Sequence, residues 1–465
     1  MKILHISAEC FPIAKVGGLA DVVGALPKYQ KDLGPTSSVV MPYYNNPFTQ
    51  NNTFETLHEH YISLGHEYYH FKVLKLTNHQ LGFDLFCIDI PELLYTDFVY
   101  SNDDTKRFLA FQVATLDWIL TLKATADIIH VHDHHAGLIP FMMSYSFKYA
   151  SLKNIPTVLT IHNAQYQGCF SHALANLIPP FNYEKIGLLD WDGSINSLAA
   201  AIKCAWSVTT VSPTYLEELK LKANGLEALL QHESEKCTGI LNGIDWNVWN
   251  PETDERLLQN FSKTTVVSGK KANKKWLCKE FNLDIKKPLF AFIGRLVGEK
   301  GADLFSAIFE QALTENKISI LLLGSGHAAT EAELAAIPKE NFNTFIGYDE
   351  KLAHIMYAGA DFLLMPSRVE PCGLNQMYSL RYGTVPIVNA TGGLKDTIID
   401  IDEKAGFGIV HDGVTVEKVT SAIHKATNYY HAKEFKKNLK RIMAIDHSWN
   451  NSAAAYVHLY KSLKN

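Results

Sequence analysis

The chain has 465 residues, of which 47% are hydrophobic and 20% are charged, and its formal net charge is −5. This length exceeds one typical core and predicts two domains, and the negative charge argues against a nucleic-acid partner because phosphate backbones select basic surfaces. The seven cysteines form no Cys-x-x-Cys pair, and we see no apolar signal core and no apolar run of membrane-spanning length, so we expect a cytoplasmic protein with no membrane partner.

The first predicted strand, residues 2–7, leads into a loop with two adjacent glycines and then a helix that starts near Leu19. Adjacent glycines let a ligand approach the backbone, a helix N-terminus favours negative charge, and Lys15 adds a positive charge at the same place. An anion site and an ordinary glycine turn with a surface lysine are both open interpretations of this loop.

Two further strands of the first half end in polar residues. Residues 127–137 read Asp-Ile-Ile-His-Val-His-Asp-His-His-Ala-Gly, and on a strand His130, His132 and His134 would face one way, which is typical of metal ligands. The apolar run 156–161 ends in His162 and Asn163. A histidine that follows a strand is more often structural than catalytic, so these residues alone do not identify a site.

The second half carries the cationic and acidic candidates. The apolar strand that begins near Phe290 is followed by Arg295 and Lys300, where a diphosphate would need them. A strand ending at Pro366 precedes a loop with Glu370, and Gly373 is predicted to open a helix whose free N–H groups suit an anion or a sugar hydroxyl.

The next buried strand, residues 384–389, delivers Thr391-Gly392-Gly393 to another helix start. Successive strand-to-helix turns of this kind predict an α/β sheet with a polar ligand at the carboxyl ends of its strands. The lysine-rich segment 263–287 is interpreted as an amphipathic helix with a solvated face, and the acidic triplets at 190–192 and 400–402 as surface.

Residues 324–326, Gly-Ser-Gly, satisfy a loose dinucleotide-binding pattern and leave open an NAD-dependent oxidoreductase. A dehydrogenase would normally place that turn on the first strand of its nucleotide fold and end the following strand with an acidic residue. Here the following strand ends near Tyr348, an aromatic residue suited to stacking on a nucleobase.

Together these segments resemble the GT-B glycosyltransferases, and closely the bacterial and plant-type glycogen (starch) synthases that use ADP-glucose. The resemblance rests on Lys-Val-Gly-Gly-Leu-Ala-Asp-Val at 15–22, on His-Val-His-Asp at 130–133 and on Thr-Ile-His-Asn-Ala-Gln-Tyr-Gln-Gly at 160–168. It implies an α/β GT-B fold with two Rossmann-like domains facing across a deep cleft. We expect residues 1–247 to form the first, 248–445 the second, and 446–465 a helix that returns to the first.

The resemblance implies transfer of glucose from ADP-glucose to the non-reducing end of an α-1,4-glucan with retention of the α configuration. ADP-glucose and the glucan are then the expected partners, with no cofactor and no metal. The residues that match the family's motifs are expected to be catalytic (Glu370, Arg295, Lys300, His162), donor-binding (Lys15, Gly18, Asp21, Tyr348, Cys372, Gly373, Leu374, Thr391, Gly392, Gly393) or acceptor-binding (Asp133, Asn163).

Several positions depart from the family pattern. His134 stands where the family has a tryptophan that packs on a sugar ring, and Glu299 replaces a glutamine beside Lys300. No second carboxylate is obviously paired with Glu370, which favours front-face attack over a covalent intermediate. The same fold using UDP-glucose or another acceptor, and a catalytically silent glucan-binding paralogue, are the alternatives.

Overall fold

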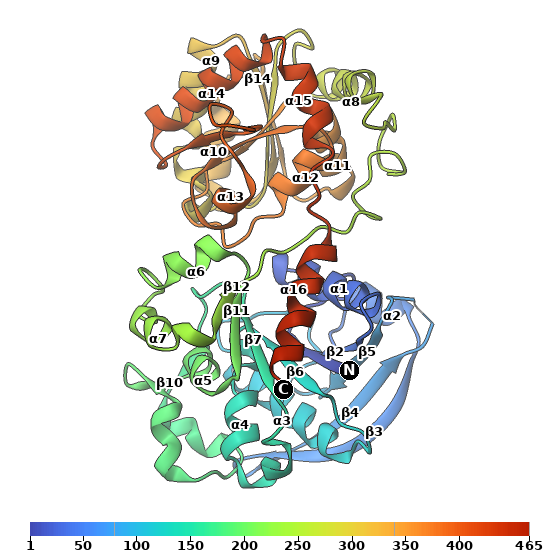
Figure 1. Cartoon of the computed structure of the whole chain (residues 1–465), viewed down its shortest axis with the longest axis vertical. Helices are drawn as coiled ribbons and strands as arrows, with labels where there is room; N and C mark the ends of the chain where they lie inside the picture. Colours follow the sequence, from blue (N-terminus) through green and yellow to red (C-terminus); the bar gives the residue numbers. More distant parts are fainter. Residues whose placement is uncertain (79, 339, 465) are drawn as a thin grey trace. The chain divides into compact units, whose positions relative to one another are not determined.

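The computed structural model describes residues 1–78, 80–338 and 340–464 and divides the chain into two compact units, shown in Figure 1. Unit 1 consists of Met1–Gly243 together with the C-terminal segment that begins at Trp449, and unit 2 of Ile244–Ser448. The boundaries expected from the sequence, at 247 and 445, lie a few residues away.

Unit 1 is built on a sheet with the strand order β12-β11-β7-β6-β1-β2-β5-β4-β3, and β8, β10 and β9 form a small antiparallel sheet beside it. Its strands are β1 (Lys2–Ile6), β2 (Thr36–Pro42), β3 (Phe54–Leu64), β4 (Glu67–Leu76), β5 (Asp84–Asp89), β6 (Ile128–His132), β7 (Thr157–Ile161), β8 (Cys169–Phe170), β9 (Asp190–Trp191), β10 (Ser194–Asn196), β11 (Ser207–Thr210) and β12 (Cys237–Gly239). Its helices are α1 (Gly18–Lys31), α2 (Pro47–Asn51), α3 (Thr105–Thr121), α4 (Ile139–Tyr145), α5 (Ser197–Cys204), α6 (Pro213–Leu219), α7 (Glu227–His232) and α16 (Trp449–Ser462).

Unit 2 is built on a fully parallel sheet with the order β15-β14-β13-β16-β17-β18. Its strands are β13 (Leu289–Ile293), β14 (Ser319–Gly324), β15 (Phe342–Ile346), β16 (Phe362–Met365), β17 (Val385–Asn389) and β18 (Ile409–His411). Its helices are α8 (Val266–Glu280), α9 (Phe305–Glu315), α10 (Ala328–Ala336), α11 (Glu350–Gly359), α12 (Asn375–Arg381), α13 (Gly392–Thr397), α14 (Val416–Tyr430) and α15 (Phe435–Ile442).

Counted along its parallel strands, the unit 2 sheet has the doubly wound order 3-2-1-4-5-6, and the unit 1 sheet has the same order with a seventh parallel strand, β12, at its edge. The order reverses between β1 and β6 in unit 1 and between β13 and β16 in unit 2. Ligands of open α/β sheets bind at such a switch point, outside the carboxyl ends of the strands. The loops after these four strands, and after their neighbours β7 and β17, carry most of the candidate residues.

The strands at the centre of both sheets are buried along their whole length because helices cover both faces. Helices α1 and α16 pack against each other over β1, β6 and β7, and Trp449, Ala453 and Tyr456 of α16 lie in that core. The C-terminal helix therefore completes the core of unit 1.

Three local expectations were wrong. Helix α12 begins at Asn375 and not at Gly373, whose φ of 71° is left-handed and cannot belong to an α-helix. Asp400 of the second acidic triplet is buried and paired with Lys425, so it is not a surface residue. His134 lies in a 3₁₀ turn after β6, and it therefore does not share a strand face with His130 and His132.

The lysine-rich helix α8 is only partly solvated. Lys270 is buried and donates to Thr384 Oγ1 at 2.6 Å and to nearby main-chain carbonyls, and Lys274 forms a buried ion pair with Asp361 at 2.7 Å. These two lysines hold α8 against the core of unit 2.

Candidate active site

The glycine loop of unit 1 joins β1 to α1. Lys15 reaches Asp21, in the first turn of α1, with its Nζ 2.8 Å from the carboxylate. Gly17 has an extended φ of −142°, and a Cβ built on Gly17 or Gly18 would meet no atom within 4 Å. Neither backbone conformation nor packing within the unit requires glycine at these two positions, so the open space beside the helix N-terminus is suited to a ligand that approaches the backbone closely.

Glu9 fixes the glycine loop through hydrogen bonds to its backbone. Its carboxylate accepts hydrogen bonds from the backbone N–H groups of Val16 at 2.6 Å and Gly17 at 3.0 Å, and from the Tyr100 hydroxyl at 2.5 Å. Glu9 is almost fully buried, and Tyr100 stacks on His135 with ring centroids 4.8 Å apart. The conformation of the glycine loop thus depends on a carboxylate that the sequence analysis did not select.

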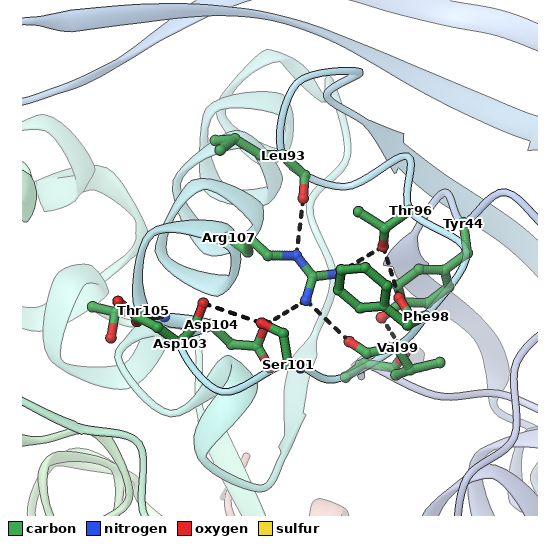
Figure 2. Close-up of polar contacts among 11 residues, drawn as sticks. Tyr44, Leu93, Thr96, Phe98, Val99, Ser101, Asp103, Asp104, Thr105 and Arg107 are labelled. Carbon is green, nitrogen blue, oxygen red and sulfur yellow. Dashed lines mark hydrogen bonds and ion pairs between the residues drawn. The ribbon is translucent and has the colours of Figure 1, made fainter.

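Arg107 of α3 holds the loop that contains Tyr100, and Figure 2 shows the loop residues around the guanidinium. The guanidinium donates to the main-chain carbonyls of Leu93 at 2.9 Å and Val99 at 3.3 Å, and to the Thr96 hydroxyl at 2.9 Å. It also pairs with Asp104 at the start of α3. One buried arginine therefore ties residues 93–104 to α3.

The residues after β6 and β7 are joined directly. Asp133 has a left-handed φ of 54°, a strained conformation for this residue, and its Oδ1 accepts the backbone N–H of His162 at 2.7 Å. Burial raises the pKa of the Asp133 carboxyl to about 7, although the bonds from the His162 and Asn163 backbones oppose this rise. Asn163 accepts the Gln165 N–H at 3.0 Å. Asp133, His162 and Asn163 thus form one polar corner of unit 1.

Behind His162 lies a group of buried histidines. The ligand atoms of His5, His130 and His132 lie within 4.8 Å of one another, a spacing that a metal ion would accept. Every ring nitrogen of these three residues, however, already takes part in a hydrogen bond between 2.6 and 3.1 Å with another side chain. A metal here would have to replace those bonds.

In unit 2, Glu370 and Lys300 form an ion pair with an N to O distance of 2.5 Å. The same carboxylate oxygen accepts the Ser367 hydroxyl at 2.8 Å, and Glu370 is only 7% exposed. Lys300 follows β13 and Glu370 follows β16, so the pair spans the switch point of the unit 2 sheet.

Arg295 is the exposed member of this group. Its side chain is 61% accessible, and its nearest charge is Glu299 at 3.9 Å. Glu299, the carboxylate that replaces the family's glutamine, therefore faces Arg295. The loops of Lys300 and Glu370 are tied together by Arg368, whose backbone N–H donates to Glu299 O at 2.7 Å and whose guanidinium binds Asp303 through two bonds. Sequence reasoning did not find Arg368.

The glycine turn after β17 packs closely on the Glu370 loop. Gly392 has a φ of 43°, and a Cβ there would collide with the carbonyl oxygen of Glu370, while one on Gly393 would collide with that of Cys372. The Gly393 N–H donates to Glu370 O at 3.1 Å. Unlike Gly17, these glycines are required by the protein's own packing.

The remaining candidates lie around the same turns. Thr391 precedes α13, Leu374 precedes α12, and Cys372 is buried between the two turns. Tyr348 follows β15 and is 79% exposed. Within unit 2 the structure thus gathers the Lys300, Glu370 and Gly392 loops at the end of the sheet, and within unit 1 the Lys15, Asp133 and His162 loops.

The chain is similar to known proteins over its whole length. Residues 2–232 match the starch synthase catalytic domain family, and residues 274–441 match the glycosyl transferases group 1 family. A glycogen synthase of Flavobacterium johnsoniae is 50% identical, covering 99% of this chain and 98% of the relative, and one of Bacillus cereus strain B4264 is 37% identical over the full length of both.

Among solved structures, the catalytic domain of starch synthase IV from Arabidopsis thaliana, bound to ADP and acarbose, superposes with a TM-score of 0.90. It is 30% identical, with 99% of each chain covered. Across residues 1–78, 80–338 and 340–464, no helix has both the length and the apolar character needed to cross a membrane.

Proposed function

Because the chain belongs to the glycogen and starch synthase family of GT-B glycosyltransferases, we propose that it transfers glucose from ADP-glucose to the non-reducing end of an α-1,4-glucan with retention of configuration. The observation that carries the proposal is the cluster of Lys300, Glu370 and Arg295 where β13 and β16 end. This cluster supplies cations for a diphosphate and a carboxylate for a sugar at the place where α/β sheets bind ligands.

Departure of the diphosphate needs fixed positive charge. Lys300 is held by Glu370, and Arg295 projects into solvent with only a distant partner, so both cations can meet phosphate oxygens. An arginine binds phosphate through two parallel N–H bonds, and electrostatic groups of this kind typically contribute about 10² to 10³ in rate. We propose that these cations act without a metal ion.

Retention is assigned to front-face attack. A covalent route uses two carboxyl groups about 5 Å apart, one of them a nucleophile. Among the described residues, the polar side chains bonded to the Glu370 carboxylate are Lys300 and Ser367, and no second carboxylate is among them. The bond from the anomeric carbon to the diphosphate breaks as the acceptor 4-hydroxyl bonds to that carbon, and the hydroxyl proton passes to the diphosphate. Glu370 holds glucose hydroxyls and stabilises the developing positive charge.

Unit 1 supplies the remaining contacts in this proposal. Lys15 and the open backbone at Gly18 bind the donor phosphate and glucose, and Asp21 holds Lys15 in place. Asp133 and Asn163 bind the acceptor, while His162 lies against the transferred glucose. Tyr348 of unit 2, with its exposed ring, stacks on the adenine.

The proposal is tested by incorporation of labelled glucose into glycogen from ADP-glucose and, separately, from UDP-glucose, with EDTA present. We expect incorporation mainly from ADP-glucose, EDTA to have no effect, and the product to be digested by enzymes specific for α-1,4 linkages. Glu370→Gln is the control for contaminating activity. Preference for UDP-glucose would overturn the donor, and glucan binding without transfer would identify a silent paralogue.

The cysteines support a proposal for the cellular compartment. All seven cysteines are free thiols, which suits a reducing environment. We therefore place the reaction in the cytoplasm, which fractionation of cells producing the full chain would test.

A further inference from the structure

A row of buried, hydrogen-bonded side chains runs through unit 1 from β11 to His162. It passes through the C-terminal helix α16 and through α1 on the way. All of its members are fully buried except His162, which is 8% exposed. Because a hydroxyl and a neutral imidazole each carry one proton to donate, the direction of every bond in the row is fixed once one end is fixed.

The fixed end is a main-chain carbonyl. The Thr209 hydroxyl donates to Leu159 O at 3.2 Å, and a carbonyl oxygen can only accept. With its proton used, Thr209 accepts the proton of Thr160 at 2.6 Å. Thr160 in turn accepts from His130, whose Nε2 lies 2.6 Å away. His130 is therefore protonated on Nε2.

The next bonds orient the amide of Gln30. Burial lowers the pKa of His130 far below its usual value, so the ring is neutral and its Nδ1 accepts the Tyr460 hydroxyl at 2.7 Å. The Tyr460 oxygen then accepts from Gln30 Nε2 at 3.2 Å. This places the amide oxygen of Gln30 toward Ser37 and His5, at 2.6 and 3.0 Å.

The Gln30 oxygen can only accept, so His5 carries its proton on Nε2. Burial lowers the pKa of His5 to about 4 and that of His132 well below its usual value, so both rings are neutral. His5 Nδ1 thus accepts from His132 Nε2 at 3.1 Å, and His132 Nδ1 accepts from His162 Nε2 at 3.0 Å. His162 is left with a proton on Nε2 and a lone pair on Nδ1.

We propose that Tyr460 of α16 and Gln30 of α1 are positioning residues for the transfer reaction, because the row they complete holds His162 as the Nε2–H tautomer. Nδ1 of His162 then carries a lone pair that can accept a hydrogen bond, and no described residue donates one to it. A sugar hydroxyl that meets this nitrogen must donate its proton. The inference rests on the proposed function in one respect, namely that His162 lies against the transferred glucose.

The tautomer can be measured without catalysis. In protein labelled with ¹⁵N-histidine, proton–nitrogen correlation spectra distinguish Nε2–H from Nδ1–H imidazoles, and the His162→Asn variant assigns the His162 signals. We expect a single Nε2–H form for His162 in the unaltered chain. An Nδ1–H form would overturn the proposal.

Tyr460→Phe removes the hydroxyl that orients Gln30 while keeping the ring in the core. We expect mixed tautomers at His162 and a fall in kcat of about tenfold with a smaller change in KM, equivalent to one hydrogen bond of about 1.4 kcal/mol. Thr209→Val, which removes the fixed end with little change of shape, is the second variant and should also mix the tautomers. Tyr149→Phe removes an equally buried hydroxyl of unit 1 that donates to Asp117 and not to the row, so it is the matched control and should retain both tautomer and kcat.

A single His162 tautomer in both Tyr460→Phe and Thr209→Val would overturn the role of the row. Mixed tautomers with an unchanged kcat in folded Tyr460→Phe would overturn the positioning role. Failure of the proposed function is a separate result, since it shows as absent glucose transfer by the unaltered chain, whatever its spectra.

Discussion

Acidification should destabilise unit 1, because it buries a group of neutral histidines. Burial lowers the pKa of His5 and His134 to about 4 and that of His162 to about 3. An unfolded histidine binds a proton near pH 6.5. Below that pH the unfolded chain takes up protons that the folded unit cannot, so the stability that is present above pH 6.5 is lost as the pH falls.

The size of the effect follows from these pKa values. Between pH 7.5 and pH 5 each of the three histidines removes about 2 kcal/mol from the free energy of unfolding, roughly 6 kcal/mol together. Asp133 acts in the opposite direction, since a carboxyl whose pKa is raised to about 7 takes up its proton first in the folded unit and offsets about 2 to 3 kcal/mol. The net loss is about 3 to 4 kcal/mol, and burial of His130, His132 and His135 adds to it.

Such a loss is a large part of the 5 to 15 kcal/mol that typically stabilises a domain. In differential scanning calorimetry we expect the melting temperature of unit 1 to fall by roughly 10 °C between pH 7.5 and pH 5. The His134→Phe variant keeps a ring but removes one titrating group, so its pH dependence should be smaller by about 2 kcal/mol. A melting temperature that stays constant over this range would refute the reasoning.

Further substitutions test the site. Glu370→Gln or Arg295→Ala should lower kcat by about 10² to 10³ with an unchanged circular dichroism spectrum; near wild-type turnover in either would contradict its assigned role. Gly17→Ala should leave the melting temperature unchanged, because its Cβ meets open space, and should raise the KM for ADP-glucose. Gly24→Ala should instead destabilise the fold, because its Cβ would lie 2.5 Å from the Phe11 carbonyl oxygen. An equal change in the KM for ADP-glucose in Gly17→Ala and Gly24→Ala would refute this distinction. Cys372→Ala should retain measurable turnover, and complete loss in a folded variant would indicate a covalent mechanism.

Much of the architecture is predictable from local patterns. A buried apolar strand followed by glycine and a helix start predicts a parallel sheet, and the rule that ligands bind at the carboxyl ends of such strands selects Lys15, His162, Arg295 and Glu370. The errors lie where local patterns are ambiguous. A glycine before an amphipathic segment resembles a helix start, yet Gly373 has a left-handed φ that delays α12.

The residues that sequence reasoning missed act through contacts between distant segments. Glu9 meets Tyr100 across 91 positions, and Arg368 meets Asp303 across 65, so no spacing within a motif can reveal them. The hydrogen-bonded row that ends at His162 depends on contacts that are even more distant in sequence. A carbonyl on β7 sets the direction of its bonds, and the row passes through Tyr460, which lies 330 positions from His130. A histidine's residue type follows from the sequence, but the nitrogen that carries its proton depends on every bond behind it. In this chain those bonds extend into the C-terminal helix, so the proton position at His162 depends on the packing of α16 onto the sheet.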